Sequence, residues 1–130
     1  YCSGTALEHT AKELMDSGAF GEYPPGRMTG RMVMAEAKKG DPMALAAVEQ
    51  FATWLGEGLS IVADVLDPEL IVIGGGVSTD AALYLDMARK EFAQRIVGSG
   101  HRPMARLSTV ELGADAGMIG VADLARQLTV

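Results

Sequence analysis

The feature that most constrains the fold is the segment 70–78, in which a short apolar run ends in three consecutive glycines. Four apolar residues between Pro68 and Gly74 predict a buried strand that is covered on both faces. Gly74, Gly75 and Gly76 predict a turn without side chains, which can take positive φ and approach a ligand closely. Ligands of open α/β sheets bind beyond the carboxyl ends of strands. This turn is therefore the best candidate in the chain for a small-molecule contact.

The glycines alone leave the ligand open. A dinucleotide-binding fingerprint would need a further glycine at position 79, where the chain has Thr79. A phosphate-binding P-loop would need Gly-Lys-Ser/Thr, and this sequence does not occur in the chain. The alternative is a tight turn between a strand and a helix that binds nothing, because glycine is a general turn residue.

Composition limits the classes of partner. A chain of 130 residues fits one domain. With 17 acidic and 11 basic residues the net charge is −6, which argues against nucleic acid as a partner. The apolar runs are too short to span a membrane, and we expect a cytoplasmic protein. The single Cys2 cannot form an internal disulfide, and no His/Cys spacing suits zinc. The chain opens with Tyr1 and leads at once into a helical pattern, so we expect it to come from a longer protein.

Two helices are predicted before position 40. The pair Thr5 and Glu8 has the spacing of a capping box, which places Thr5 at the start of the first helix. The segment 21–26 contains two prolines and two glycines and predicts a loop. A second helix is predicted from about Thr29 to Lys39 and is stopped by Gly40.

A helix of about 25 residues is predicted next, with Asp41 as N-cap and Pro42 in its first turn. Asp67 ends it, because a residue before proline avoids helical geometry. Gly56 and Gly58 lie inside this helix, and we expect close packing of another element against both. Apolar residues recur at steps of three and four and predict one continuous buried stripe: Leu45, Val48, Ala52, Leu55, Leu59, Val62 and Leu66.

The rest of the chain predicts helix, strand and helix. The first of these helices ends near Val97, and its buried face is predicted from Leu85, Ala88, Phe92 and Ile96. A strand is predicted over 106–112, and a final helix over about 115–127. The fold class is therefore α/β, rich in helix, with two strands. Two strands rarely form a stable parallel sheet alone, so another chain or an upstream segment is expected to complete it.

Several segments together resemble the ROK family of sugar kinases and repressors. The run 70–78, behind a long helix ending at 66–69, resembles the family's C-terminal part. Segment 1–7 resembles the stretch that follows the family's zinc motif, and Thr29 with Gly30 resembles the helix start after it. Segment 113–122 resembles its closing helix. The resemblance covers nearly the whole chain, and within the family it is greatest to bacterial glucokinases.

The resemblance implies an actin-like, ribonuclease-H-like fold whose two lobes close around ATP and a sugar. Residues 1–130 would be a single fragment of the C-terminal lobe, without the upstream lobe and its strands. Gly74, Gly75, Gly76, Val77 and Ser78 would form the nucleotide-binding motif. The final helix would act as a hinge element in which two glycines, at 117 and 120, allow close helix crossing.

The resemblance also implies an ATP-dependent glucokinase that uses Mg²⁺ and phosphorylates glucose at the 6-hydroxyl. The catalytic aspartate and a structural zinc site would lie upstream of this chain, which would hold no catalytic residue and no metal ligand. A homo-oligomer is expected. The alternative is the sugar-sensing body of a ROK-type transcriptional repressor. A helical dimerisation module, paired through the long apolar stripe, ranks third.

Five further side chains have alternative interpretations. His9 is interpreted as a surface residue of the first helix. His101 and Arg102 lie in a glycine-rich loop, where a solvated turn is favoured over a phosphate contact. Asp115 is interpreted as a cap of the last helix. Trp54 either anchors a subunit interface or packs in the core.

Overall fold

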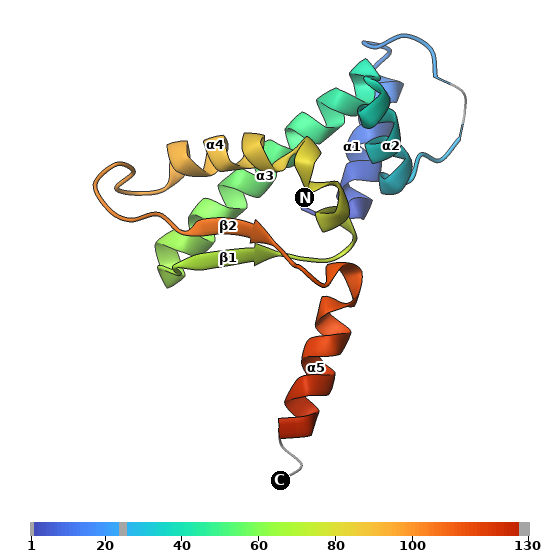
Figure 1. Ribbon diagram of the computed structural model, residues 1–130. Helices are drawn as coiled ribbons and strands as arrows, with labels where there is room; N and C mark the ends of the chain where they lie inside the picture. Colours follow the sequence, from blue (N-terminus) through green and yellow to red (C-terminus); the bar gives the residue numbers. More distant parts are fainter. Residues whose placement is uncertain (1, 24–25, 128–130) are drawn as a thin grey trace.

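The computed structural model describes residues 2–23 and 26–127. Helices and strands follow the predicted order, and two short 3₁₀ helices, η1 and η2, are added. Tyr1 of the family-like first segment, and Pro24 and Pro25 of the predicted loop, lie outside the described residues. Figure 1 shows the elements α1 (Gly4–Asp16), α2 (Gly30–Lys39), α3 (Pro42–Leu66), β1 (Leu70–Ile73), η1 (Gly76–Leu83), α4 (Leu85–Arg95), β2 (Arg106–Thr109), η2 (Gly113–Asp115) and α5 (Ala116–Gln127).

The long helix α3 begins and ends where the sequence predicts. The Asp41 carboxylate accepts a hydrogen bond of 2.8 Å from the backbone N–H of Ala44, and Pro42 is the first helical residue. At the other end Asp67 takes a left-handed conformation with φ 44°. Its N–H donates to the carbonyl oxygen of Ala63. The two ends therefore confirm the predicted 25-residue helix.

The predicted buried stripe of α3 is only half right. Leu45, Val62 and Leu66 are exposed, whereas Val48, Ala52 and Leu59 are buried. The face of α3 that packs against the neighbouring helices contains more small side chains than the predicted stripe, because those helices approach α3 closely. Its buried residues are Met43, Ala44, Ala47, Val48, Phe51, Ala52, Gly56, Leu59, Ser60 and Ala63.

Of the two glycines inside α3, only one packs closely. A Cβ atom at Gly56 would lie 2.7 Å from the carbonyl oxygen of Ala88 and 2.9 Å from the backbone nitrogen of Phe92, both on α4. Gly56 therefore lets the two helices touch backbone to backbone. At Gly58 a Cβ would meet no atom within 4 Å among the described residues, so the prediction for that glycine is wrong.

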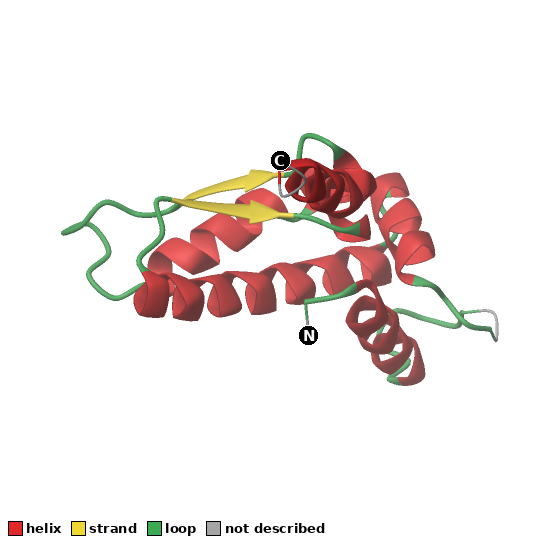
Figure 2. Ribbon diagram, turned by 90° about the horizontal axis from the view of Figure 1, so that it is seen from below, coloured by secondary structure: helices red, strands yellow, loops and turns green. Residues whose placement is uncertain are grey.

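The two strands pair in parallel, and α3 and α4 lie on one side of them (Figure 2). Register places Leu70 opposite Arg106 and Ile73 opposite Thr109. Strand β2 ends at Thr109, three residues earlier than predicted. Ile73 is buried, but Leu70 and Val72 are about half exposed, which corrects the prediction that β1 is covered on both faces. Residues of β1 alternate between the two faces, and the described elements cover one of them.

Helix α4 presents the predicted apolar face. Leu85, Ala88 and Phe92 are buried, as is Ile96 just after the helix ends at Arg95.

Helices α1 and α2 pack against the amino-terminal end of α3, whereas the strands begin near its carboxyl-terminal end (Figure 1). The core therefore runs along α3, with α1 and α2 near one end and α4 beside the other.

Helix α1 starts at a different cap from the predicted one. It begins at Gly4, and the Ser3 hydroxyl accepts the backbone N–H of Ala6 at 3.2 Å. Thr5 is already inside the helix, and the Glu8 carboxylate is bonded elsewhere. The capping-box prediction is therefore wrong, because Ser3 supplies the same chemistry two residues earlier.

Helix α5 extends away from the other helices (Figure 1), and none of its described residues is buried. Asp115 belongs to η2, directly before α5 begins at Ala116. A Cβ at Gly117 or Gly120 would meet no atom within 4 Å, so the described residues contain no close helix crossing there. Within residues 2–23 and 26–127, no helix combines the length and apolar character needed to cross a bilayer.

Candidate functional site

The glycine turn joins β1 to η1 and is closed by its own hydrogen bonds. Gly75 has φ 79° and ψ −172°, a conformation that other residues rarely adopt. Its carbonyl oxygen accepts the backbone N–H of Ser78 at 3.1 Å and the Ser78 hydroxyl at 2.7 Å. On one side the turn lies against Val110, whose Cγ1 would be 3.2 Å from a Cβ at Gly74. The turn is therefore a defined structure and not a loose connection.

A buried tyrosine supports the turn from the core. The hydroxyl of Tyr84 donates a hydrogen bond of 3.0 Å to the carbonyl oxygen of Val77. The Tyr84 ring is fully buried and meets Phe51 of α3 edge to face, with ring centroids 5.0 Å apart. Burial, and then the charge of Asp80, raise the pKa of the Tyr84 phenol above its usual value. Tyr84 thus stays a neutral donor and ties the start of η1 to the core.

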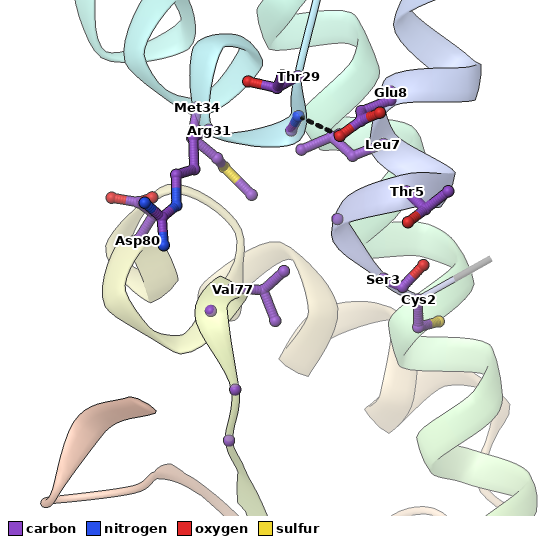
Figure 3. Close-up of a pocket in the computed structure, with 15 residues that line it drawn as sticks. Cys2, Ser3, Thr5, Leu7, Glu8, Thr29, Arg31, Met34, Val77 and Asp80 are labelled. Carbon is purple, nitrogen blue, oxygen red and sulfur yellow. Dashed lines mark hydrogen bonds between the residues drawn. The ribbon is translucent and has the colours of Figure 1, made fainter. Parts of the chain in front are cut away.

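The turn opens onto a cavity of about 590 Å³ (Figure 3). One wall comes from the start of α1, at residues 2–5, 7 and 8. A second comes from the start of α2, at residues 29–31 and 34, and the third from the glycine turn and η1, at residues 74–77 and 80. Three helices therefore begin at this cavity. The dipoles of α1 and α2 give the rim a partial positive charge. The N–H groups of Ala6, Met32 and Gly30 are already accepted by Ser3, Thr29 and Glu8.

Helices α1 and α2 are joined where they enter the cavity wall. A Cβ at Gly30 would lie 2.7 Å from the carbonyl oxygen of Gly4, so the two backbones are in direct contact. The Glu8 carboxylate accepts the Gly30 N–H at 3.2 Å through one oxygen and the Arg27 guanidinium at 2.9 Å through the other. The hydrogen bond from Arg27, followed by that from Gly30, lowers the pKa of Glu8. Glu8 therefore remains ionised and fixes the start of α2.

The three charged side chains that line the cavity differ in their pairing. Glu8 is paired with Arg27, and Asp80 is paired with Lys38 at 2.5 Å. Neither Arg27 nor Lys38 belongs to the lining. Among the described residues, no hydrogen bond or ion pair to the Arg31 side chain is found. Both carboxylates are thus neutralised from outside the cavity, and the guanidinium of Arg31 remains as its unpaired charge.

The predicted nucleotide-binding residues separate into two groups. The cavity is lined by Gly74, Gly75, Gly76 and Val77. Ser78 is buried instead, and its hydroxyl donates a hydrogen bond to the carbonyl oxygen of Gly75. The contribution of α1 and α2 was missed from the sequence. The sequence does contain a pattern that indicates these two helix starts. In each, a capping residue is followed by a glycine: Ser3 before Gly4, and Thr29 before Gly30.

The other candidate side chains lie away from the cavity. His9 is exposed and lies 3.3 Å from Glu13 on α1, as expected for a surface residue. His101 is exposed, and Arg102 bonds Asp64 at 2.9 Å near the far end of α3, so neither reaches the cavity. Trp54 is partly exposed on α3. Among residues 2–23 and 26–127, no cluster of three or more His, Cys, Asp or Glu is placed to hold a metal ion.

The chain matches the ROK family over residues 1–128. It is 35% identical to a glucokinase of Streptomyces coelicolor, over 98% of this chain and 43% of that protein. A crystal structure of a ROK family glucokinase from Streptomyces griseus, in complex with glucose and AMPPNP, superposes with a TM-score of 0.87 at 36% identity. That superposition covers 98% of this chain and 43% of the other. The chain thus spans less than half the length of these relatives.

A regulator shares the fold at lower similarity. The structure of a ROK family transcriptional regulator superposes with a TM-score of 0.67 at 20% identity, over 82% of this chain and 27% of the other. At that identity the likeness extends to the fold alone. The helix-rich arrangement with two parallel strands is part of the actin-like sugar kinase fold of these proteins.

Proposed function

Because this chain belongs to the ROK family, we propose that the intact protein is an ATP-dependent sugar kinase that phosphorylates glucose at its 6-hydroxyl. This chain contributes the adenosine side of the nucleotide site, with Gly74, Gly75, Gly76 and Val77 beside the nucleotide and Ser78 closing the turn. The observation that carries the proposal is a glycine turn, held by Ser78 and Tyr84, that opens onto a cavity of about 590 Å³.

The physical argument is steric and electrostatic. A turn of three glycines brings bare backbone to the cavity, so a ligand can approach where any other residue would place a Cβ. The rim carries the amino ends of α1 and α2, which favour a negatively charged ligand. A cavity of this size is in the range that holds small molecules and cofactors. ATP meets all three conditions.

In the proposed reaction the γ-phosphoryl group of ATP passes to the sugar hydroxyl, with an aspartate elsewhere in the intact protein taking the proton. Mg²⁺ would offset phosphate charge in the intact protein. The described residues contain no cluster suited to a metal ion, so we assign neither a Mg²⁺ ligand nor a zinc ligand to this chain. Its residues bind and orient the nucleotide and do not perform the chemistry.

The test is sugar-dependent ADP formation by the intact protein with Mg-ATP and a panel of hexoses. We expect turnover, greatest with glucose. The variant Gly75→Asp should weaken ATP binding, since it adds bulk and like charge beside the phosphates. Unchanged ATP affinity in a folded Gly75→Asp protein would contradict the assignment of the turn.

The sugar-sensing body of a transcriptional repressor is the second candidate. The observation in its favour is the fold shared with a ROK family regulator. A folded intact protein without turnover on any sugar would place this candidate first and make the glycine turn structural. We favour the kinase because a sensor that binds only sugar does not need a glycine turn open to a nucleotide-sized cavity.

A further inference from the structure

Arg31 is the charged group in the cavity whose role the fold does not explain. It lies in the first turn of α2, is exposed, and its side chain lines the cavity. Figure 3 shows its guanidinium on the same side of the cavity as Asp80, across from Ser3 and Thr5. Arg27, close by in the sequence, joins α1 to α2 by pairing with the Glu8 carboxylate, and Arg31 makes no such pair among the described residues. The Asp80 carboxylate forms its ion pair with Lys38, at 2.5 Å, which leaves Arg31 available to a ligand.

The surroundings of Arg31 suit a neutral aromatic group better than a phosphate. Met34 follows Arg31 by three residues on α2 and therefore lies on the same face of the helix. It is buried and lines the cavity, and Leu7 and Val77 add apolar lining. The Asp80 carboxylate, on the neighbouring wall, is paired with Lys38 and does not bind the guanidinium. A purine base is flat, uncharged and electron-rich, and a guanidinium stacks favourably on such a face.

We propose that Arg31 determines nucleotide affinity by stacking its guanidinium on the purine base of the bound nucleotide. The proposal rests on the proposed function, because it places ATP in this cavity. The phosphates then extend toward the glycine turn, where backbone and no side chain faces them. Arg31 acts on binding of the base and has no part in phosphoryl transfer.

The experiment uses the intact protein and two variants of the same residue. Arg31→Met keeps the length of the side chain without charge, and Arg31→Lys keeps the charge without the flat guanidinium. The control is Lys39→Met, at the other end of α2 and outside the cavity lining. Dissociation constants are measured by calorimetry for ATP, adenosine and inorganic tripolyphosphate, and a thermal midpoint confirms that each variant is folded.

We expect both Arg31 variants to raise the dissociation constants of ATP and adenosine by about three- to tenfold and to leave that of tripolyphosphate unchanged. The control should change none of the three. Weaker tripolyphosphate binding in Arg31→Met, restored in Arg31→Lys, would overturn the proposal and assign Arg31 to the phosphates. Unchanged ATP and adenosine binding would overturn it too, while leaving the kinase assignment intact if the unaltered protein turns over. An unaltered protein that neither binds nor uses ATP would overturn both.

Discussion

The hydroxyl of Tyr84 lies 3.0 Å from the carbonyl oxygen of Val77, and this hydrogen bond connects the buried core to the wall of the cavity. Val77 lines the cavity, whereas Tyr84 is fully buried against Phe51 of α3. The position of η1 is therefore set by a residue that no ligand touches. Changes in the core at this point are expected to alter nucleotide binding.

Tyr84→Phe tests this connection. The variant keeps the ring in the core and removes the donor, so the Val77 carbonyl loses its partner. We expect a decrease of about 1 kcal/mol in the free energy of unfolding, measured with urea. ATP affinity of the intact protein should fall as well, measured by calorimetry.

Tyr23→Phe is the matched control for that prediction. Tyr23 donates to the Asp41 carboxylate at 3.0 Å, away from the cavity lining. The same chemical change there should lower stability without altering ATP affinity. Equal ATP affinities in Tyr84→Phe and the unaltered protein would show that the hydrogen bond does not position the turn.

Gly56 and Gly58 give opposite predictions for the same substitution. Gly56→Ala forces a Cβ to within 2.7 Å of the Ala88 carbonyl oxygen and should destabilise the protein by about 1–3 kcal/mol as α3 and α4 separate. Gly58→Ala meets no atom within 4 Å among the described residues and should stabilise by up to about 1 kcal/mol through helix propensity. Thermal and urea unfolding measure both. A stabilised Gly56→Ala protein would refute the close contact of the two helices.

Gly76→Val separates bulk in the cavity from backbone strain. Gly76 lines the cavity, but it lacks the positive φ of Gly75, and a Cβ there would meet no atom within 4 Å among the described residues. We therefore expect weaker ATP binding, measured by calorimetry, with little change in the thermal midpoint. Gly117→Val on the exposed helix α5 is the control, since Gly117 is not in the lining. If Gly76→Val binds ATP as tightly as the unaltered protein does, the nucleotide binds elsewhere.

Glu8→Gln should show a defined pH dependence. The partners of Glu8 lower its pKa in the folded protein below the ordinary value of 4.5. A lowered folded-state pKa stabilises the fold at pH values above the unfolded-state pKa, and the stabilisation is lost as pH falls through the folded-state pKa. The thermal midpoint of Glu8→Gln should therefore lie below that of the unaltered protein at neutral pH.

This difference should shrink once the pH is below 4.5. Glu49→Gln, on the exposed face of α3, is the comparison variant. A difference between Glu8→Gln and the unaltered protein that stays constant with pH would mean that the Glu8 charge does not stabilise the join of α1 and α2.

The sequence predicted those parts of the fold that local chemistry decides. Asp41 with Pro42 marks the start of α3, and the glycine turn marks the end of β1, because capping and turn formation depend on neighbouring residues. The buried face of α3 was predicted only in part. Which of its faces packs depends on where α1, α2 and α4 lie, and residue spacing does not contain that information.

The site was predicted on one wall only. A run of three glycines is visible in the sequence, whereas the meeting of Gly4 with Gly30 joins segments 26 positions apart and depends on how α1 and α2 cross. Ser3, and not the predicted Thr5, caps α1, so the helix begins earlier than the sequence predicts. The family resemblance is confirmed. The nucleotide-binding role of the glycine turn stays a prediction that Gly75→Asp and Gly76→Val can test.

The ion pair between Lys38 and Asp80 makes the cavity sensitive to ionic strength. It links α2 to η1, two walls of the cavity that are 42 positions apart in the sequence, and 57% of the Lys38 side chain is exposed. Dissolved salt screens such a pair, because its cationic end is in water. Ionic strength is therefore expected to weaken the contact between the two walls, and not only the attraction for a charged ligand. Adenosine carries no charge, and its affinity for the Arg31→Met variant would report this dependence without a contribution from Arg31.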